Sequence, residues 1–223
     1  FNEEQRLPRM LADARTWLAA SGLAFEILVV DDGSTDGTVD VCRAFAAHTP
    51  ELRVISSSPN RGKGHAVRVG MLAARGALVL MCDADGSTPM RELAKLLARR
   101  ENAAIAIGSR YLDGGTAHGQ PLWRRAWSRL AHVIVRRSLL PGIRDAHCGF
   151  KLFTAEAARD LFSRSTVDGW TFDLEILALA QRRGHAIVEV AVDWRDDARS
   201  RVRAGRDLLR VVHETLAIER TLR

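Results

Sequence analysis

Two patterns of apolar residues alternate along the first half of the chain. Apolar side chains at helical spacing predict a helix over Glu3–Ala20 and three further helices, which end near His48, Arg75 and Arg99. Short continuous apolar runs rich in branched side chains are typical of buried parallel strands. Such runs predict strands over Phe25–Val30, Leu52–Ile55, Ala77–Cys82 and Ala103–Ile107.

This alternation predicts an α/β fold with a Rossmann-like, mostly parallel sheet flanked by helices. In such sheets ligands bind at the carboxyl ends of the strands. Three polar clusters follow the predicted strands: Asp31-Asp32, Asp83–Asp85 and Ser109-Arg110. We therefore expect their side chains to converge on one edge of the sheet.

The second half of the chain is less regular. Helical spacing predicts a basic amphipathic helix over Pro121–Leu140, helices near Ala155–Phe162 and Trp170–Arg183, and a C-terminal amphipathic helix over residues 202–222. Strands are predicted over Cys148–Phe153 and Ala186–Trp194. No repeat, low-complexity segment or linker divides the sequence, so residues 1–223 are interpreted as a single domain.

Charge adds information about partners. The 223 residues carry a net charge of +6 with only three lysines, so nearly all of the positive charge is arginine. Arginine binds phosphate in a bidentate manner, which makes phosphorylated substrates, anionic lipids and nucleic acid candidate partners. The charge is spread along the chain and no nucleic-acid-binding motif occurs, so we expect no nucleic acid partner. Three separated cysteines indicate free thiols in a reducing compartment.

The sharpest local signal is Asp83-Ala84-Asp85, which directly follows an apolar strand. Two carboxylates placed there can hold a hard divalent cation, and such a cation can bridge a nucleotide diphosphate. A pair of solvated loop aspartates is the alternative. A haloacid-dehalogenase-type phosphotransferase with Asp83 as nucleophile also fits the motif, but it leaves Asp31-Asp32 and Asn60–Gly64 unexplained.

Two other polar loops each allow a binding and a structural interpretation. A carboxylate of Asp31-Asp32 could accept hydrogen bonds from a base or ribose, whereas Ser34 or Thr35 could simply cap the next helix. Asn60–Gly64 could bring backbone amides and a lysine near a phosphate, or form an ordinary glycine-rich turn. The sequence leaves both alternatives open.

Tryptophan and arginine interleave over Leu122–Arg129. Rings at headgroup depth and charges on lipid phosphates are features of an interfacial membrane helix. A core helix with one exposed basic side is the alternative. The membrane interpretation predicts weak, salt-sensitive attachment to anionic membranes through Leu122–Leu140.

Taken in order, these segments resemble the family 2 glycosyltransferases, which have the GT-A fold. The resemblance is carried by Phe1–Glu4, Asp31–Thr38, Asn60–Gly64 and Asp83–Asp85. Arg144–Phe153 and Gly169–Glu175 are similar to polyprenyl-phosphate glycosyltransferases, among them the dolichyl-phosphate β-glucosyltransferases. The resemblance covers nearly the whole chain. It implies an inverting enzyme that moves a sugar from a nucleotide-sugar donor to a polyprenyl or dolichyl phosphate.

The resemblance also implies a donor site. Its nucleoside would be contacted by Phe1, Glu3 and Asp32, with Lys63 and Ala84 also at the donor. Asp83 would contact the ribose or the sugar. Asp85, with Ser87 nearby, would ligate Mg²⁺ or Mn²⁺ on the diphosphate.

On the acceptor side, the resemblance implies that Arg110, Arg125 and Arg201 hold the phosphate. Arg110 and Arg125, together with Asp83 and Asp85, are the candidate catalytic residues. A lipid monophosphate is mostly a dianion at neutral pH, so no general base is expected. Asp173 and Glu175 stand where base-dependent relatives place their carboxylate, and we interpret them as orienting groups or residues of the core edge.

Two departures from the family pattern refine these expectations. Phe1 stands where tyrosine is usual, and Gly86-Ser87 replace the Leu-Gln of the mannosyltransferases. We therefore expect UDP-glucose rather than GDP-mannose as donor, and a peripheral location on the cytoplasmic face of a membrane. The family segment at the start is cut at its first aromatic residue, so a further strand before Phe1 is expected.

Overall fold

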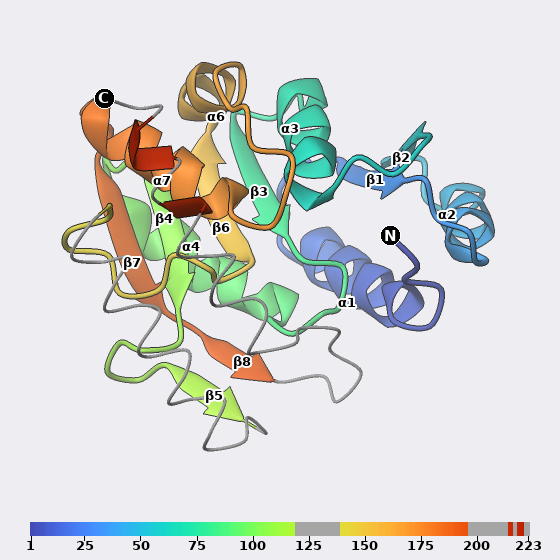
Figure 1. Ribbon diagram of the computed structural model, residues 1–223. Coiled ribbons are helices and arrows are strands. Elements are labelled where there is room, and N and C mark those ends of the chain that lie inside the picture. The colour runs from blue at the N-terminus through green and yellow to red at the C-terminus, as the bar shows by residue number, and fades with distance from the viewer. Residues whose placement is uncertain (119–138, 196–213, 216–217, 221–223) are drawn as a thin grey trace.

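The computed structural model describes residues 1–118, 139–195, 214–215 and 218–220. Its central element is a four-stranded sheet in the order β3-β6-β4-β7 (Figure 1). The strands are β3 (Leu78–Cys82), β4 (Ile105–Ser109), β6 (Phe150–Thr154) and β7 (Ile187–Ala191). Strand β6 runs antiparallel to both of its neighbours, whereas β4 and β7 are parallel.

Two small parallel sheets complete the strands that the structure describes. One pairs β1 (Ile27–Asp32) with β2 (Leu52–Ser57), and the other pairs β5 (Thr116–His118) with β8 (Asp193–Arg195). The prediction of an α/β fold with mostly parallel strands is confirmed, with β6 as the antiparallel exception. The predicted strand over Ala186–Trp194 is wrong in one respect, because the chain leaves the central sheet after β7 and pairs with β5 instead.

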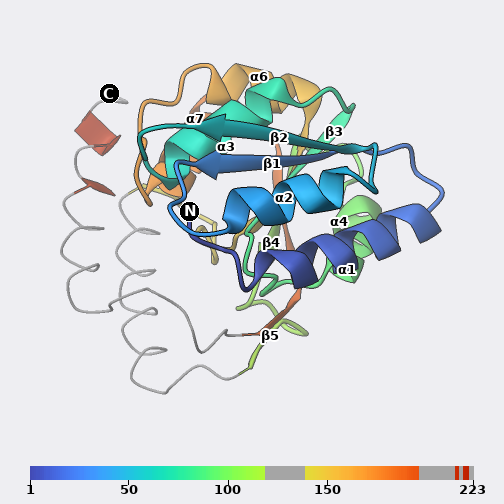
Figure 2. The same ribbon diagram turned by 90° about the vertical axis from the view of Figure 1, so that its right-hand side faces the viewer.

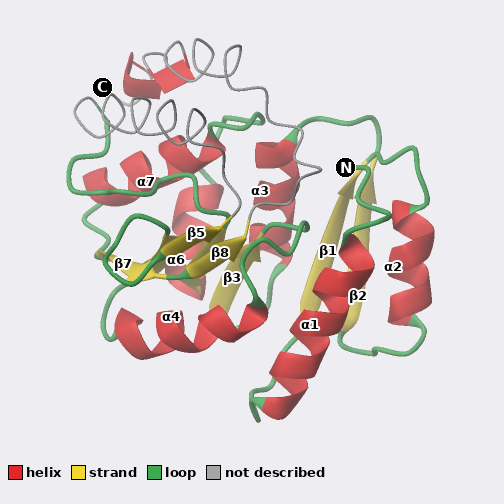
Figure 3. Cartoon of the chain, turned by 90° about the horizontal axis from the view of Figure 1, so that it is seen from below, coloured by secondary structure: helices red, strands yellow, loops and turns green. Residues whose placement is uncertain are grey.

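Helices cover both faces of the central sheet (Figure 3). One face is covered by α3 (Lys63–Ala73), α6 (Ala155–Phe162) and α7 (Phe172–Arg182). The other face is covered by α1 (Leu7–Ala20), the 3₁₀ helix η1 (Met90–Glu92) and α4 (Leu93–Arg100). Helix α2 (Thr38–Ala46) packs on the β1–β2 sheet (Figure 2), and α3 contacts β1 as well as β3. Helix α3 therefore joins the two sheets.

Alternation of side chains along the strands separates two apolar cores. On β3, Val79 and Met81 pack against α3, α6 and α7, whereas Leu78 and Leu80 pack against α1 and α4. The same alternation places Lys151 of β6 on the face that α7 covers, although this residue lies in a run of apolar neighbours. A charged side chain is thus buried where the pattern alone predicts only packing.

Several predictions fall on residues that the structure leaves undescribed. Most of the predicted helix over Pro121–Leu140 lies outside the described residues, as do most of residues 202–222, of which 214–215 and 218–220 are helical. Among the described helices, none has the length and apolar character needed to cross a bilayer. The single-domain interpretation and the further strand before Phe1 stay predictions.

Candidate functional site

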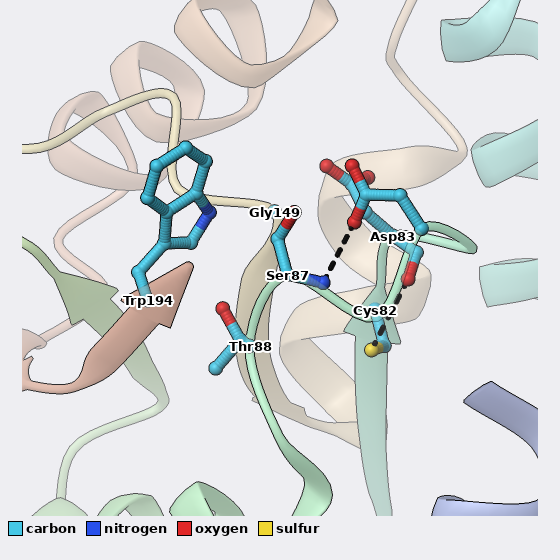
Figure 4. A pocket seen from close by; sticks show the side chains of 7 residues that line it. Cys82, Asp83, Ser87, Thr88, Gly149 and Trp194 are labelled. Carbon is cyan, nitrogen blue, oxygen red and sulfur yellow. Dashed lines mark hydrogen bonds between the residues drawn. The ribbon is translucent and has the colours of Figure 1, made fainter. Parts of the chain in front are cut away.

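A polar site lies at the carboxyl end of β3. A small pocket there is lined by Cys82, Asp83, Asp85, Ser87, Thr88, Gly149 and Trp194 (Figure 4). The backbone N–H of Ser87 donates to Asp85 Oδ1 at 2.9 Å, which shapes the turn that follows the strand. Asp83, Asp85 and Ser87, which the resemblance assigns to the donor and the metal, thus line one pocket, and their roles stay predictions.

Gly149 faces the carboxylate of Asp83 across this pocket. Asp83 donates its backbone N–H to the carbonyl of Gly149 at 2.9 Å, because the two residues continue the β3–β6 ladder. A Cβ atom at position 149 would collide with the Asp83 carboxylate. The missing side chain of Gly149 therefore makes room for Asp83 in its observed position.

The donor set fits a metal ion that arrives with a diphosphate better than a metal held by protein alone. Across residues 1–118 and 139–195, no group of three or more His, Cys, Asp or Glu side chains is placed to hold a metal. Mg²⁺ usually keeps one or two protein carboxylates and takes its other ligands from water and substrate phosphates. The hydrogen bond from Ser87 engages one Asp85 oxygen, and Asp85 still lines the pocket.

Lys63 links this pocket to helix α3. Its Nζ atom lies 2.7 Å from Asp83 Oδ1 and 5.0 Å from the centre of the Trp170 ring. Burial disfavours the charged form of this lysine, but the carboxylates of Asp83 and Asp173 outweigh it, so the pKa of Lys63 is raised. A lysine that stays charged beside Asp83 suits the predicted place of Lys63 at an anionic donor.

Four backbone amides at the loop before α3 are bonded within the chain. The N–H groups of Arg61 and Gly62 donate to the carboxylate of Asp32, at 3.1 and 2.7 Å for the shortest contacts. The N–H groups of Gly64 and His65 donate to the carbonyl oxygen of Asp168. These four N–H groups hold the chain together, which favours the turn interpretation, and the place of Lys63 near a phosphate stays a prediction.

The glycines of this loop serve close backbone packing. A Cβ atom on Gly62, which has a φ of 116°, would collide with the carbonyl oxygen of Asp168. A Cβ atom on Gly64 would collide with that of Val167. The sequence left the role of these glycines open because the segment they approach lies about a hundred positions later in the chain.

The Asp31-Asp32 turn is held by its own carboxylates. Asp31 accepts a hydrogen bond from the N–H of Ser34, and helix α2 begins after Gly37 without a side-chain cap. The expected cap by Ser34 or Thr35 is therefore wrong. Asn2 bonds both of these residues instead, with its N–H on Ser34 Oγ at 2.8 Å and its Oδ1 accepting from Thr35 at 2.9 Å.

The start of the chain is thus fastened beside the carboxyl end of β1. The backbone N–H of Glu3 donates to Thr38 Oγ1 at 2.7 Å, and its carboxylate forms an ion pair with Arg6. The ring of Phe1 is 47% exposed. Nucleoside contacts by Phe1, Glu3 and Asp32, and a donor contact by Ala84, stay predictions.

Arg110 at the end of β4 forms a buried bidentate ion pair. Its Nε and Nη2 atoms donate to the two oxygens of Asp145, each at 2.8 Å, and its backbone N–H also donates to Asp145. Burial opposes the charge, but Asp145 outweighs it and raises the pKa of Arg110 far above its ordinary value. The acceptor role of Arg110 stays a prediction, and Arg125 and Arg201 lie outside the described residues.

Helix α7 contributes two buried carboxylates that serve different partners. Asp173 Oδ1 accepts from Lys151 Nζ at 2.6 Å, and burial raises the pKa of Asp173 even though Lys151 counteracts this. Glu175 accepts hydrogen bonds from the N–H groups of Thr166 and Val167 and from the hydroxyl of Ser165. Glu175 is thereby committed to the loop that leads into α7, and its interpretation as an orienting group or a core-edge residue stays a prediction.

Sequence reasoning missed several residues around the site. Asp145 and Lys151 lie in Arg144–Phe153, a segment that carries the family resemblance, but neither was given a role. Trp194 stood only at the end of a predicted strand. Asp145 is fully buried, and its N–H donates to Glu189 Oε1 at 2.9 Å. Each of these residues acts through a partner that is distant in sequence.

A mixed α/β sheet with two carboxylates after one strand, and a lysine of helix α3 beside them, is the arrangement expected of a glycosyltransferase of the GT-A class. The sequence model of the family "Glycosyl transferase family 2" matches residues 1–162, and the chain belongs to this family. This membership removes the haloacid-dehalogenase-type alternative.

Curated relatives narrow the comparison. The chain is 38% identical over 233 residues to a dolichyl-phosphate beta-glucosyltransferase of Drosophila melanogaster, covering 95% of this chain and 72% of the relative. The human protein of that name is 37% identical, with 94% and 71% covered. One from Trichomonas vaginalis is 36% identical, with 91% and 64% covered. The chain thus spans about two thirds of the length of these relatives.

Solved structures agree on the fold. Glucosyl-3-phosphoglycerate synthase from Mycobacterium tuberculosis, in complex with Mn²⁺, UDP-glucose and phosphoglyceric acid, superposes with a TM-score of 0.72 at 18% identity and covers 98% of this chain and 76% of that one. Mannosyl-3-phosphoglycerate synthase from Rubrobacter xylanophilus gives 0.69 at 22% identity, with 97% and 70% covered. At these identities the likeness establishes the GT-A fold.

Proposed function

We propose that this chain transfers glucose from UDP-glucose to a polyprenyl or dolichyl phosphate, with inversion and with Mg²⁺ or Mn²⁺ as cofactor. The observation that carries the proposal is the pocket at the end of β3, where Asp83 and Asp85 lie together in a family 2 glycosyltransferase. The names of the curated relatives support the lipid phosphate acceptor and the sugar. The complex of the mycobacterial neighbour supports UDP-glucose and a divalent ion.

The proposed donor chemistry divides between Asp85 and Lys63. Asp85 would hold the divalent ion, which when bound neutralises charge on the leaving diphosphate. Lys63, kept charged by Asp83, lies 2.7 Å from that carboxylate and adds a fixed positive charge at the same edge. Fixed charges of this kind stabilise developing negative charge without reorganisation during the reaction.

The proposed acceptor chemistry needs no general base. The lipid phosphate is already ionised, so the remaining task is to bring two anions together. Arg110 uses its Nε and one Nη2 hydrogen for Asp145. A guanidinium has five N–H donors, and the proposal gives others of them to the phosphate. Attack on the face opposite the diphosphate converts an α-linked donor into a β-linked product.

A transfer assay tests the proposal directly. Radiolabelled UDP-glucose is incubated with polyprenyl phosphate in detergent, with Mn²⁺ or with excess chelator. We expect a lipid-linked product that β-glucosidase cleaves, formed only with the metal. Two control acceptors are tested under the same conditions. One is 3-phosphoglycerate, and the other is polyprenol, which lacks the phosphate. Glucose transfer to 3-phosphoglycerate but not to the lipid phosphate would contradict the proposed acceptor.

Peripheral attachment to the cytoplasmic face of a membrane is part of the proposal. Its support is the sequence of Leu122–Leu140, which contains five arginines and no acidic residue. Each basic residue near an anionic surface contributes about 1 kcal/mol, which sets an upper bound of about 5 kcal/mol. Liposome flotation at low and high salt tests this, and equal recovery on neutral and anionic vesicles would contradict it.

A further inference from the structure

We propose that Trp194 forms the wall of the sugar subsite, where its indole ring contacts the hexosyl group of the donor. The proposal rests on the proposed function, because it assumes a nucleotide-sugar donor at the Asp83–Asp85 edge. The observation that motivates it is that Trp194 is the aromatic residue of the pocket lined by these carboxylates. In Figure 4 the ring stands across the pocket from Asp83.

The residues on both sides of Trp194 are bonded to the segment that follows Asp85, from Ser87 to Glu92. The N–H of Arg195 donates to the carbonyl oxygen of Ser87 at 2.9 Å. On the other side, the N–H of Asp193 donates to Glu92 Oε2 at 3.1 Å, and its carboxylate binds Arg91 at 2.9 Å. Strand β8 therefore moves with the turn that carries Asp85, so the distance between Trp194 and the acidic edge is set by the fold.

The indole ring is also held by a cation. The guanidinium carbon of Arg110 lies 5.1 Å from the ring centre, within the range of a cation–π contact. Arg110 is itself held by two hydrogen bonds to Asp145, whose side chain is fully buried. A ring placed by its backbone and by a fixed cation is preorganised, which lowers the entropy cost of binding against it.

The other groups of this pocket select a neutral, hydroxyl-rich ligand. Its lining side chains carry two carboxylates, two hydroxyls and a thiol. The ammonium of Lys63, which contacts the lining, is paired with Asp83. Carboxylates accept hydrogen bonds from sugar hydroxyls, whereas they repel a phosphate that carries no metal. The pocket is therefore suited to the hexose rather than to the acceptor phosphate.

Indole complements a hexose in two ways. A pyranose ring has an apolar C–H face, and flat aromatic rings supply a large apolar contact area with little side-chain entropy to lose. The indole N–H is a donor only, and Figure 4 shows the nitrogen on the edge of the ring turned toward Gly149 and Ser87. One edge of Trp194 can thus donate to a sugar hydroxyl while the ring packs on carbon.

The experiment compares UDP-glucose with UDP in the presence of Mn²⁺. The measured quantity is the ratio of the two dissociation constants, obtained by calorimetry, which isolates the contribution of the sugar. We expect Trp194→Leu to weaken UDP-glucose about tenfold and leave UDP unchanged. We expect Trp194→Phe, which keeps a ring but lacks the N–H, to weaken UDP-glucose about threefold. Trp17→Leu, on helix α1 and partly buried against the apolar core, is the matched control and should leave the ratio unchanged.

Other results would contradict either the sugar subsite or the proposed function. Equal weakening of UDP and UDP-glucose by Trp194→Leu would place the ring on the nucleotide and overturn the sugar subsite. An unchanged ratio combined with a raised KM for polyprenyl phosphate would assign the wall to the acceptor. If the wild-type protein binds UDP-glucose and the ratio never changes, the Trp194 proposal alone fails. If the wild-type protein binds no UDP-glucose, the proposed function fails and this proposal fails with it.

Discussion

Two acidic pairs follow strands of the first half of the chain, and each is succeeded by Gly-Ser. Asp31 and Asp32 at the end of β1 are each 3% exposed and accept hydrogen bonds from backbone N–H groups of the chain itself. Asp83 and Asp85 after β3 line a pocket, and the side chain of Asp83 is 32% exposed. The first pair holds two loops together, whereas the second borders the candidate site.

The difference lies in what the rest of the fold places opposite each pair. The loop at Arg61 and Gly62 brings two N–H groups onto Asp32, and these fill both of its oxygens. Opposite Asp83 the fold places Gly149, which has no side chain to fill the space. A pair of aspartates is thus a structural support where backbone amides of another loop meet it, and borders a pocket where a glycine and the side chain of Lys63 face it.

The largest expected effect is a loss of turnover in Asp85→Asn. Loss of the charge that would hold the divalent ion should lower turnover at least a thousandfold, roughly 4 kcal/mol of transition-state stabilisation. Because Asp85 faces a pocket rather than the core, the thermal midpoint should stay close to that of the wild type. Initial rates at saturating Mn²⁺ and UDP-glucose, with a melting curve on the same sample, test this. Full activity with normal metal dependence would contradict the assignment.

A third acidic residue sharpens the comparison, because Asp173 is buried and paired yet lies near the site. Asp173→Leu leaves the ammonium of Lys151 buried without its partner, which should cost about 3–5 kcal/mol of unfolding free energy. The double variant Asp173→Leu with Lys151→Met replaces the ion pair by apolar side chains and should recover most of this loss. Urea unfolding measures both.

The same double variant tests the absence of a general base. If Asp173 only supports the fold, the refolded double variant should keep its turnover within about tenfold of the wild type, roughly 1.4 kcal/mol. A stable double variant that binds UDP-glucose normally but turns over a thousandfold more slowly would show that Asp173 is the base. The acceptor would then be a hydroxyl rather than a phosphate.

A smaller effect, on the free energy of unfolding, is expected for Asp32→Asn. The amide keeps one acceptor oxygen, but it loses charge-assisted hydrogen bonds to the N–H groups of Arg61 and Gly62, worth about 2 kcal/mol. The unfolding free energy should fall by about that amount in urea titrations, while Asp85→Asn should leave it unchanged. A stability loss that is larger for Asp85→Asn than for Asp32→Asn would reverse the roles given to the two pairs.

The smallest effect concerns the thiols beside the two pairs. Burial, helped by Asp31, raises the pKa of Cys42 to about 11, and burial, helped by Asp145, raises that of Cys148 to about 12. The reactive thiolate is therefore scarce at pH 8, and both cysteines should label more slowly in the folded chain than after unfolding, where thiols have a pKa near 8.5. Labelling of native protein should accelerate as the pH rises toward 11.

The order of labelling in urea separates the two regions. Cys42 belongs to a small apolar cluster between α1, α2 and the β1–β2 sheet, whereas Cys148 packs in the larger core beneath β6. Smaller cores open at lower free energy, so Cys42 should become reactive at lower urea than Cys148. Simultaneous labelling, read by peptide mass spectrometry, would show that the two regions unfold as one unit.

Local patterns were sufficient for most of the elements and for the position of Asp83 and Asp85 after a strand. Apolar runs located the strands because burial on both faces requires them, and the strand-end rule then located the acidic edge. The direction of a strand cannot be predicted in this way, because the sequence of β6 is an apolar run whether the strand is parallel or antiparallel. Its orientation is known only from its pairing with β3 and β4.

The remainder could not be predicted because it depends on contacts between distant segments. Asp32 and Asp83 are chemically identical, and their different roles follow from Arg61, Gly62 and Gly149. Trp194 entered the site because the chain turns from β7 into β8 and fastens to Ser87. No periodicity within either segment contains that information.

The most direct test of the central claim is the Mn²⁺ dependence of UDP binding. We assign the divalent ion to the carboxylate of Asp85. The carboxylate of Asp32, in contrast, supports the Arg61-Gly62 turn. Calorimetry with and without Mn²⁺ should show that Asp32→Asn keeps the increase in affinity that the metal brings, whatever its affinity without metal. Asp85→Asn should lose that increase entirely. An unchanged metal effect in Asp85→Asn, or its loss in Asp32→Asn alone, would contradict the account.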